Sequence, residues 1–260
     1  MRETALVTGA SGGIGEDLAR LIAAGGRNVV LLARSAGKLQ SLAGDLSTAH
    51  GIEASVVAAD LSEPGATAQI VGTLGARSAT IDVLVNNAGF GTSGSFASDD
   101  PNAQLGMLQV NVVALTALTR ALLPGMLERK RGRILNVAST AAFQPGPFMA
   151  TYYASKAYVL SLSEALAEEV AGSGVTVTCL CPGPTQTGFQ DRAQLQKSRL
   201  FNLSRPMRSA DVAQAGYDAM LAGRRLVIPG VTNKLTVQSI RISPRAAVLK
   251  VVRFLNTESA

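Results

Sequence analysis

The segment TYYASKAY (residues 151–158) places a lysine beside several tyrosines, a combination that can move protons. If a helix begins near Thr151, Lys156 lies one turn after both Tyr152 and Tyr153, because helix positions three and four apart are neighbours. A free phenol has a pKa of about 10, and an adjacent ammonium group lowers that value. The segment therefore predicts a tyrosine that gives and takes protons near neutral pH, and the helix spacing alone leaves both tyrosines as candidates.

A second segment that could do chemistry is ALVTGASGGIG (residues 5–15), in which Gly9, Gly13 and Gly15 follow an apolar run. Glycines permit a tight turn and a close approach of the backbone to a ligand. Where such a turn joins a strand to a helix, the helix N-terminus offers free N–H groups and partial positive charge to a pyrophosphate. The hydroxyl of Ser11 adds a further contact, so the loop predicts a dinucleotide site.

Strand-like apolar runs alternate with helix-like stretches and must position these residues, among them TALVTGA, NVVLLAR, EASVVAADL, IDVLVNNAG, GRILNVAS and VTVTCLCPG. This alternation indicates βαβ units and a parallel sheet, and near-continuous apolar strands are expected where helices cover both faces. Long helices are predicted over roughly residues 102–129 and 151–171. We therefore expect an α/β fold, a Rossmann-type doubly wound parallel sheet, with residues 1–260 in a single dinucleotide-binding and catalytic domain.

These motifs, in this order, resemble the short-chain dehydrogenase/reductase family. The resemblance rests on T-G-x-x-x-G-x-G in the first loop, N-N-A-G after the fourth strand, Y-x-x-x-K, and P-G after the sixth strand. It implies that Tyr152, thirteen residues after Ser139, is the catalytic acid and base, and that Tyr153 is not. It also implies that Lys156 lowers the tyrosine pKa and binds the nicotinamide ribose, that Ser139 binds the substrate oxygen, and that Asn111 holds a relay water.

The same resemblance implies the residues that hold the cofactor. The loop would bind the pyrophosphate, the ends of the third and fourth strands the adenosine, and the turn after the sixth strand the nicotinamide carboxamide. The implied cofactor-binding residues are Gly9, Ser11, Gly13, Ile14, Gly15, Arg34, Asp60, Leu61, Asn87, Ala88, Gly89, Tyr152, Lys156, Pro182, Gly183, Thr185 and Thr187.

The end of the second strand predicts which nicotinamide cofactor binds. An acid there would accept hydrogen bonds from the ribose of NAD and repel a 2′-phosphate. Ala33 occupies that position, Arg34 follows it, and Lys38 is nearby. Because a guanidinium binds phosphate as a fork, the sequence favours NADP(H), the alternative being that Arg34 is only a solvated surface side chain.

Aromatic and other apolar residues around the predicted site indicate an apolar substrate, although any of them could instead belong to the core. The candidates for substrate contact are Phe143, Phe148, Met149 and Phe189. Residues 188–208, which include Phe201, look like the substrate lid of the family.

The net charge of +6 resides in residues 221–260, which have seven cations and one acid, while the rest of the chain has 17 of each. Residues 231–260 form a basic amphipathic tail with three open interpretations: packing on its own domain or a subunit interface, contact with an acidic membrane surface, or binding of an anionic substrate or carrier. Nucleic acid is not expected as a partner, since residues 1–220 are neutral overall.

The metal-ligand inventory predicts no zinc site of the alcohol-dehydrogenase kind. His50 is the only histidine, and Cys179 and Cys181 alternate on one predicted strand, where a disulfide would be strained and reduced thiols are expected. Reduced thiols suit a cytoplasmic protein. An uncharged run over residues 101–119 is not expected to span a membrane, because it contains four amide side chains that are costly in lipid.

These inferences predict an oxidoreductase that transfers a hydride between NADP(H) and an apolar carbonyl or alcohol substrate through a Ser-Tyr-Lys-Asn group. Such an enzyme would be a carbonyl reductase or alcohol dehydrogenase, and we expect a homo-oligomer, either a dimer or a tetramer. One alternative is a lipid or acyl-chain ketoreductase at a membrane surface. Another is a dinucleotide sensor without turnover, although a sensor has no need of Ser139, Tyr152 and Lys156.

Overall fold

The computed structural model describes residues 2–77, 79–189, 199 and 205–257 of the chain. Its helices and strands follow one another in the alternating order that the sequence predicts. In chain order they are β1 (Thr4–Thr8), α1 (Gly13–Ala24), β2 (Asn28–Ala33), α2 (Ala36–His50), β3 (Ala54–Ala58), α3 (Ala66–Ala76), β4 (Val83–Asn86), α4 (Pro101–Leu108), η1 (Gln109–Ala114), α5 (Leu115–Glu128), β5 (Gly132–Val137), η2 (Thr140–Phe143), α6 (Ala150–Glu169), β6 (Val175–Leu180), β7 (Thr185–Gln186), β8 (Met207–Arg208), α9 (Ser209–Leu221), β9 (Leu226–Val227), α10 (Val231–Ile242) and α11 (Arg245–Asn256).

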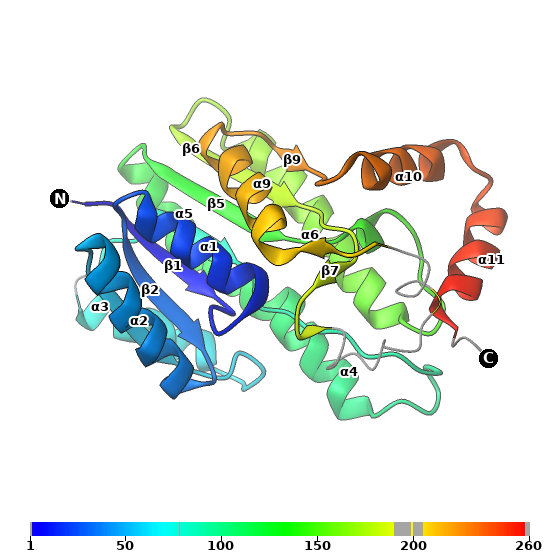
Figure 1. Cartoon of the computed structure of the whole chain (residues 1–260), viewed down its shortest axis with the longest axis horizontal. Coiled ribbons are helices and arrows are strands. Elements are labelled where there is room, and N and C mark those ends of the chain that lie inside the picture. The colour runs from blue at the N-terminus through cyan, green and yellow to red at the C-terminus, as the bar shows by residue number, and fades with distance from the viewer. Residues whose placement is uncertain (1, 78, 190–198, 200–204, 258–260) are drawn as a thin grey trace.

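A parallel sheet of seven strands, in the order β3-β2-β1-β4-β5-β6-β9, forms the centre of the molecule, with helices on both faces (Figure 1). Successive strand residues point to opposite faces. On β1, Ala5 and Val7 therefore pack with α1, α2 and α9, whereas Leu6 packs with α3, α5 and α6. This arrangement confirms the predicted Rossmann-type sheet. The strand order reverses between β1 and β4, which places a ligand crevice at the carboxyl ends of these strands.

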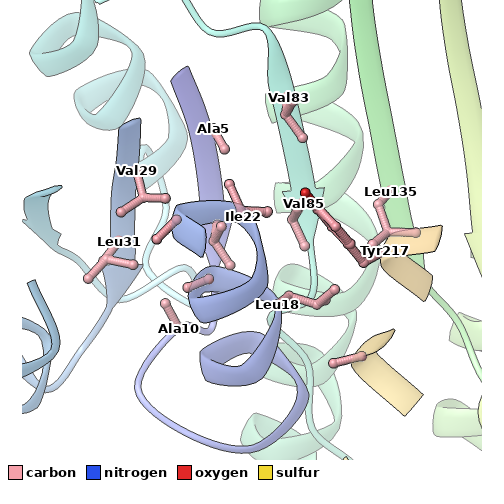
Figure 2. Packing of buried hydrophobic residues seen from close by; sticks show 14 of the residues in the cluster. Ala5, Ala10, Leu18, Ile22, Val29, Leu31, Val83, Val85, Leu135 and Tyr217 are labelled. Atoms are coloured by element: carbon pink, nitrogen blue, oxygen red, sulfur yellow. The ribbon is translucent and has the colours of Figure 1, made fainter. Parts of the chain in front are cut away.

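The helix that follows the glycine loop is fixed by close packing on the sheet. Figure 2 shows α1 across β1, β2 and β4, with Leu18 and Ile22 on the side that faces the strands. Both side chains are fully buried, and the small residue Ala5 on β1 leaves room for the helix. Burying one such side chain stabilises the fold by about 1.5–3 kcal/mol. The start of α1, and the loop before it, are held in place by this packing.

The long helix predicted over residues 102–129 consists of three segments. It begins with Pro101 at its first position, where Asp100 caps the amide of Asn102, and it changes to a π-helix over Gln109–Ala114 before continuing as α5. By length and composition Pro101–Glu128 could cross a membrane. One side of it, which includes Leu118, is nevertheless buried in the core against the sheet.

The basic tail forms two helices, α10 and α11, at the end of the molecule furthest from α2 and α3 (Figure 1). The inner face of α11 buries Val248 and Val252 against Met149 and Tyr153. Of the three interpretations of the tail, packing on its own domain therefore holds for this inner face.

Candidate active site

A cavity of about 1130 Å³ opens at the carboxyl ends of the strands and continues beneath the tail helices. It gathers most of the residues that the sequence singled out. Those that line it are Gly9, Ser11, Gly13, Ile14, Arg34, Asp60, Leu61, Asn87, Ala88, Gly89, Ser139, Met149, Tyr152, Lys156, Pro182, Gly183, Thr185, Thr187 and Phe189. Four predicted residues do not line the cavity: Gly15, Asn111, Phe143 and Phe148.

The glycine loop is held against the end of β4, and two of its glycines have no room for a side chain. Gly9 has a φ of 68°, and a Cβ there would lie 2.7 Å from Nδ2 of Asn87. A Cβ on Gly15 would overlap the same amide and the carbonyl of Gly9, so Gly15 serves loop packing behind the cavity wall. Asn87 in turn donates from Nδ2 to the Thr8 carbonyl at 3.0 Å. The helix N-cap is Gly12, which has no side chain to cap the free N–H groups of α1.

Thr8, which sequence reasoning passed over, fixes the loop to β4. Its hydroxyl donates to the Val85 carbonyl at 3.1 Å and accepts from the amides of Asn87 at 2.9 Å and Ala88 at 3.0 Å. A threonine directly before the first glycine could have signalled this role, since its side chain ends the strand beside the neighbouring one.

At the other side of the loop, Arg34 lies beside Asp60. Nη1 of Arg34 is 3.5 Å from Oδ2 of Asp60, and the arginine side chain is 55% exposed. Burial opposes ionisation of Asp60, but hydrogen bonds from Ser62 and the charge of Arg34 keep the pKa of this carboxyl below its ordinary value. With Lys38 also on the cavity wall, this end of the cavity has two cations.

Ser139, Tyr152 and Lys156 meet in the middle of the cavity. Tyr152 and Lys156 are one turn apart in α6, and Nζ of Lys156 lies 5.9 Å from the centroid of the Tyr152 ring. The Tyr152 phenol faces the Ser139 hydroxyl, whose influence lowers the pKa of the phenol. Lys156 donates from Nζ to the Val137 carbonyl at 2.9 Å. The hydroxyl of Ser139 accepts from the amide of Ala141 at 3.1 Å, which orients it at the start of η2.

Burial is the largest influence on the pKa values of Tyr152 and Lys156. It raises the pKa of Tyr152 well above its ordinary value, which the influence of Ser139 only partly offsets. Burial also lowers the pKa of Lys156 to about 8, against the opposing influence of the thiols of Cys179 and Cys181. The net shift of the Tyr152 pKa is therefore upward, because lost hydration disfavours the phenolate, and a lowering of this pKa by Lys156 stays a prediction.

Asn111 lies behind the cavity wall, inside the π-helical segment, and is 1% exposed. Its Nδ2 donates to the Phe90 carbonyl at 2.9 Å and to the Ser155 hydroxyl at 3.0 Å, and its Oδ1 accepts from the Phe90 amide at 3.1 Å. Oδ1 of Asn111 and Nζ of Lys156 both point to the backbone of Gly89, where an added Cβ would lie 3.0 Å and 3.3 Å from them. π-Helical segments are rare and often occur at functional sites.

A buried polar chain, which sequence reasoning missed, joins β4, β5 and the helices beside them. Asn86 donates from Nδ2 to the Thr119 hydroxyl at 3.0 Å and to Oδ1 of Asn136 at 2.9 Å. Asn136 donates to the Ser163 hydroxyl at 2.9 Å, and this hydroxyl donates to the Val159 carbonyl at 2.6 Å. Two asparagines at the same register in adjacent apolar strands were the available signal.

The substrate end of the cavity differs from the expectation. Met149 and Phe189 line it, and the Phe189 ring lies 5.3 Å from the Tyr152 ring. Phe143 instead packs on a separate core cluster, and the Phe148 ring lies 5.8 Å from the Arg253 guanidinium. Neither residue lines the cavity. The predicted lid, residues 188–208, lies mostly outside the described residues, as does Phe201.

The tail supplies a wall that sequence reasoning did not assign to the site. The residues concerned come from both tail helices and the turn between them, and they are mostly polar on α10 and apolar on α11. They are Thr232, Asn233, Thr236, Ser239, Ile240, Ser243, Ala247, Val248, Val251, Val252 and Leu255. The spacing of Val248, Val252 and Asn256 marks one face of a helix, but nothing in the sequence states what that face covers.

A pair of buried hydrogen bonds ties this wall to the catalytic helix. Asn256, which is 4% exposed, accepts from the Tyr153 hydroxyl at 3.2 Å and donates from Nδ2 to the Pro147 carbonyl at 2.9 Å. Tyr153 therefore faces α11, away from the centre of the cavity. We refer to Tyr153, Asn256 and Pro147 as the tail latch.

The described residues contain no group of three or more metal-ligating side chains. Cys179 and Cys181 are both buried free thiols, as the sequence predicted, with their sulfur atoms 3.7 Å apart.

The geometry agrees with comparisons to known proteins. A family model described as short chain dehydrogenase matches residues 3–198. The chain is 34% identical over 205 residues to the granaticin polyketide synthase putative ketoacyl reductase 1 of Streptomyces violaceoruber, which covers 78% of this chain and 75% of that protein. It is 37% identical over 182 residues to the very-long-chain 3-oxoacyl-CoA reductase of Anas platyrhynchos, which covers 68% of this chain and only 58% of that relative's length.

Among solved structures, the fold is similar to a short-chain dehydrogenase from Sphingobium yanoikuyae in complex with NADPH. The TM-score is 0.82 at 30% sequence identity, over 94% of this chain and 97% of the other. The family match covers most of the sequence, and the parallel sheet carries the cavity at the expected edge. The chain therefore belongs to the short chain dehydrogenase family and is an oxidoreductase.

Proposed function

We propose that this protein is an NADP(H)-dependent reductase of apolar ketones, with Ser139, Tyr152, Lys156 and Asn111 as its catalytic group. The observation that carries the proposal is the convergence of Ser139, Tyr152 and Lys156 on one cavity that runs from the glycine loop to an apolar wall. Reduction requires a proton donor for the carbonyl oxygen, and the phenol is that donor.

The chain's residues fit a dinucleotide. Gly9 packs closely on Asn87 and has no side chain, so the backbone of the loop is accessible to a ligand. The uncapped start of α1 offers N–H groups to a pyrophosphate. When bound, the cofactor supplies or accepts the hydride. Arg34 and Lys38 would hold the 2′-phosphate, because Ala33 places no carboxylate at the end of β2 to repel it.

In the proposed reaction, Ser139 and Tyr152 both hydrogen-bond the carbonyl oxygen, and Tyr152 transfers its proton as negative charge develops there. The Lys156 ammonium, close to the ring, stabilises the phenolate that remains. Asn111, whose Oδ1 points to Gly89 as Nζ of Lys156 does, supports the return of a proton from solvent to the lysine. Since burial raises the pKa of Tyr152, the phenol stays protonated until the carbonyl oxygen becomes basic.

The substrate class follows from the wall opposite Tyr152, which Met149, Phe189, Val248 and Val252 make apolar. The names of two relatives point to ketones on acyl chains, and such ketones belong among the substrates to be tested.

The proposal is tested by following NADPH oxidation with a panel of aldehydes, small ketones, bulky aromatic ketones and 3-oxoacyl thioesters. We expect turnover that is highest for bulky apolar ketones. NADPH binding without turnover of any member of the panel would instead support the dinucleotide sensor.

The cofactor preference has its own test. Arg34→Ala should weaken NADPH binding roughly tenfold or more, since one charge-assisted hydrogen bond is lost, and leave NADH binding unchanged. Arg120→Ala, an exposed arginine on α5, is the matched control. Equal NADPH affinity of the Arg34 variant and the wild type, measured by fluorescence titration, would contradict the NADP(H) assignment.

A further inference from the structure

The outer face of α10 carries apolar side chains where a surface helix normally carries polar ones. Val231, Leu235 and Ile242 are 73%, 67% and 83% exposed. Their spacing of four and seven residues places them on one face of the helix, opposite Val237, which is buried. Single exposed apolar residues are ordinary, but three on one face of a helix form a stripe that favours contact with an apolar phase.

Cations border this stripe on both tail helices. Lys234 and Arg241 lie on the flank of α10, and α11 adds Arg245, Lys250 and Arg253 together with Phe254, which is 55% exposed. Residues 231–257 contain no acid, and none of these five cations is paired with a carboxylate among the described residues. An apolar stripe bordered by unpaired cations has the composition of a helix that lies in a membrane interface.

The charge decides between the possible occupants of this face. A second copy of the chain, docked tail to tail, would bring five cations against five like charges, and residues 1–220 are neutral overall. An anionic bilayer offers both an apolar phase and charge that compensates each cation near the surface. We propose that α10 and α11 dock on an anionic lipid bilayer through Val231, Leu235 and Ile242 and the surrounding cations.

The inner faces of the same two helices line the cavity, through Ile240 on α10 and Val248 on α11. Docking thus places α10 and α11, which form one wall of the cavity, against the lipid. The docking itself does not depend on the proposed function, since it rests on the outer face alone.

Vesicle flotation of the full chain tests the proposal. The protein should float with vesicles of phosphatidylcholine mixed with phosphatidylglycerol, should not float with phosphatidylcholine alone, and should dissociate at high salt. Leu235→Glu should reduce partition about tenfold or more, because it replaces an inserted apolar side chain with a charge. Lys234→Gln and Arg241→Gln should each reduce it about fivefold.

Matched variants separate insertion from general surface effects. Leu105→Glu on α4 changes a leucine that is 65% exposed, close to the 67% of Leu235, and should leave partition unchanged, as should Arg120→Gln. Circular dichroism establishes that each variant is folded. Leu235 does not line the cavity, so the Leu235 variant should also keep the wild-type rate with a water-soluble ketone, which separates a failure of docking from a failure of the proposed reaction.

Two outcomes would overturn the proposal. One is the absence of any partition into phosphatidylglycerol vesicles at low salt. The other is a wild type that sediments as a dimer and does not bind vesicles, together with a Leu235→Glu variant that sediments as a monomer. That result would make this face an interface between copies of the chain.

Discussion

Tyr152 and Tyr153 are neighbours in the chain but have different partners. Tyr152 faces Ser139 in the cavity, and Tyr153 donates to the buried Asn256. Tyr152→Phe should therefore lower NADPH-dependent turnover about 100-fold or more, whereas Tyr153→Phe should keep most of it. Tyr158→Phe, whose hydroxyl lies 2.9 Å from that of Thr116 at the surface, is the control. The assignment fails if the Tyr153 variant is the inactive one in steady-state kinetics.

The buried Lys156 should make stability depend on pH. Its pKa falls from 10.5 to about 8 in the folded chain, so between those values the unfolded chain binds more protons and stability rises with pH. Relative to Lys156→Met, the wild type should gain roughly 2–3 kcal/mol of unfolding free energy between about pH 7 and pH 10. Urea titrations of both proteins at the two pH values measure this gain. A constant difference between the two proteins would mean that the lysine is not desolvated.

Among the elements, α11 depends on the tail latch for its position over the cavity. Asn256→Ala leaves the Tyr153 hydroxyl buried without its acceptor, which should cost about 1–3 kcal/mol of unfolding free energy. A loosened wall should also raise KM for bulky ketones several-fold while kcat and NADPH affinity change little. Lys250→Ala, on the exposed side of the same helix, should change neither quantity. An unchanged KM in the Asn256 variant would show that the latch does not shape the substrate end.

The elements also show how far sequence reasoning reaches. Apolar runs predicted the sheet, because strand pattern is local and parallel sheets follow strict connection rules. The family resemblance implied the roles of Ser139, Tyr152 and Lys156, since helix spacing alone left Tyr152 and Tyr153 as candidates. The π-helical turn at Asn111 could not be predicted, since it accompanies hydrogen bonds to Phe90, 21 positions away. The residue spacing likewise indicated that one face of α11 is apolar, but it did not indicate that this face packs on Met149 and Tyr153.

At the scale of the molecule, the two faces of one sheet should unfold together. Leu18 and Leu118 lie on opposite faces, and both are fully buried. Leu18→Ala and Leu118→Ala should each lower the unfolding free energy by about 2–5 kcal/mol while urea unfolding stays a single transition. Leu105→Ala, at an exposed site, should change it by less than about 0.5 kcal/mol. A split transition in either core variant, seen by comparing tyrosine fluorescence with circular dichroism, would contradict the prediction of a single domain.

The direction of the pKa shifts is another property of the whole molecule that the sequence could not supply. The neighbour relation of Tyr152 and Lys156 is local, but the loss of water around both depends on the strands, the loops and the tail that enclose them. For the same reason Phe143 and Phe148 could not be assigned from the sequence, because an aromatic residue beside a site can face the cavity or the core.

The buried polar chain from Thr119 to Ser163 has a mechanical consequence for catalysis. Apolar contacts keep a helix close to a sheet but resist its rotation weakly, because they have no preferred direction. The bond from Asn136 to Ser163 is directional, so it resists the turning of α6 about its own axis. Ser163 lies about three turns beyond Tyr152, and a rotation of the helix there would swing the phenol sideways from Ser139. The orientation of the Tyr152 phenol toward Ser139 is therefore set in part by Asn136, in the middle of the sheet.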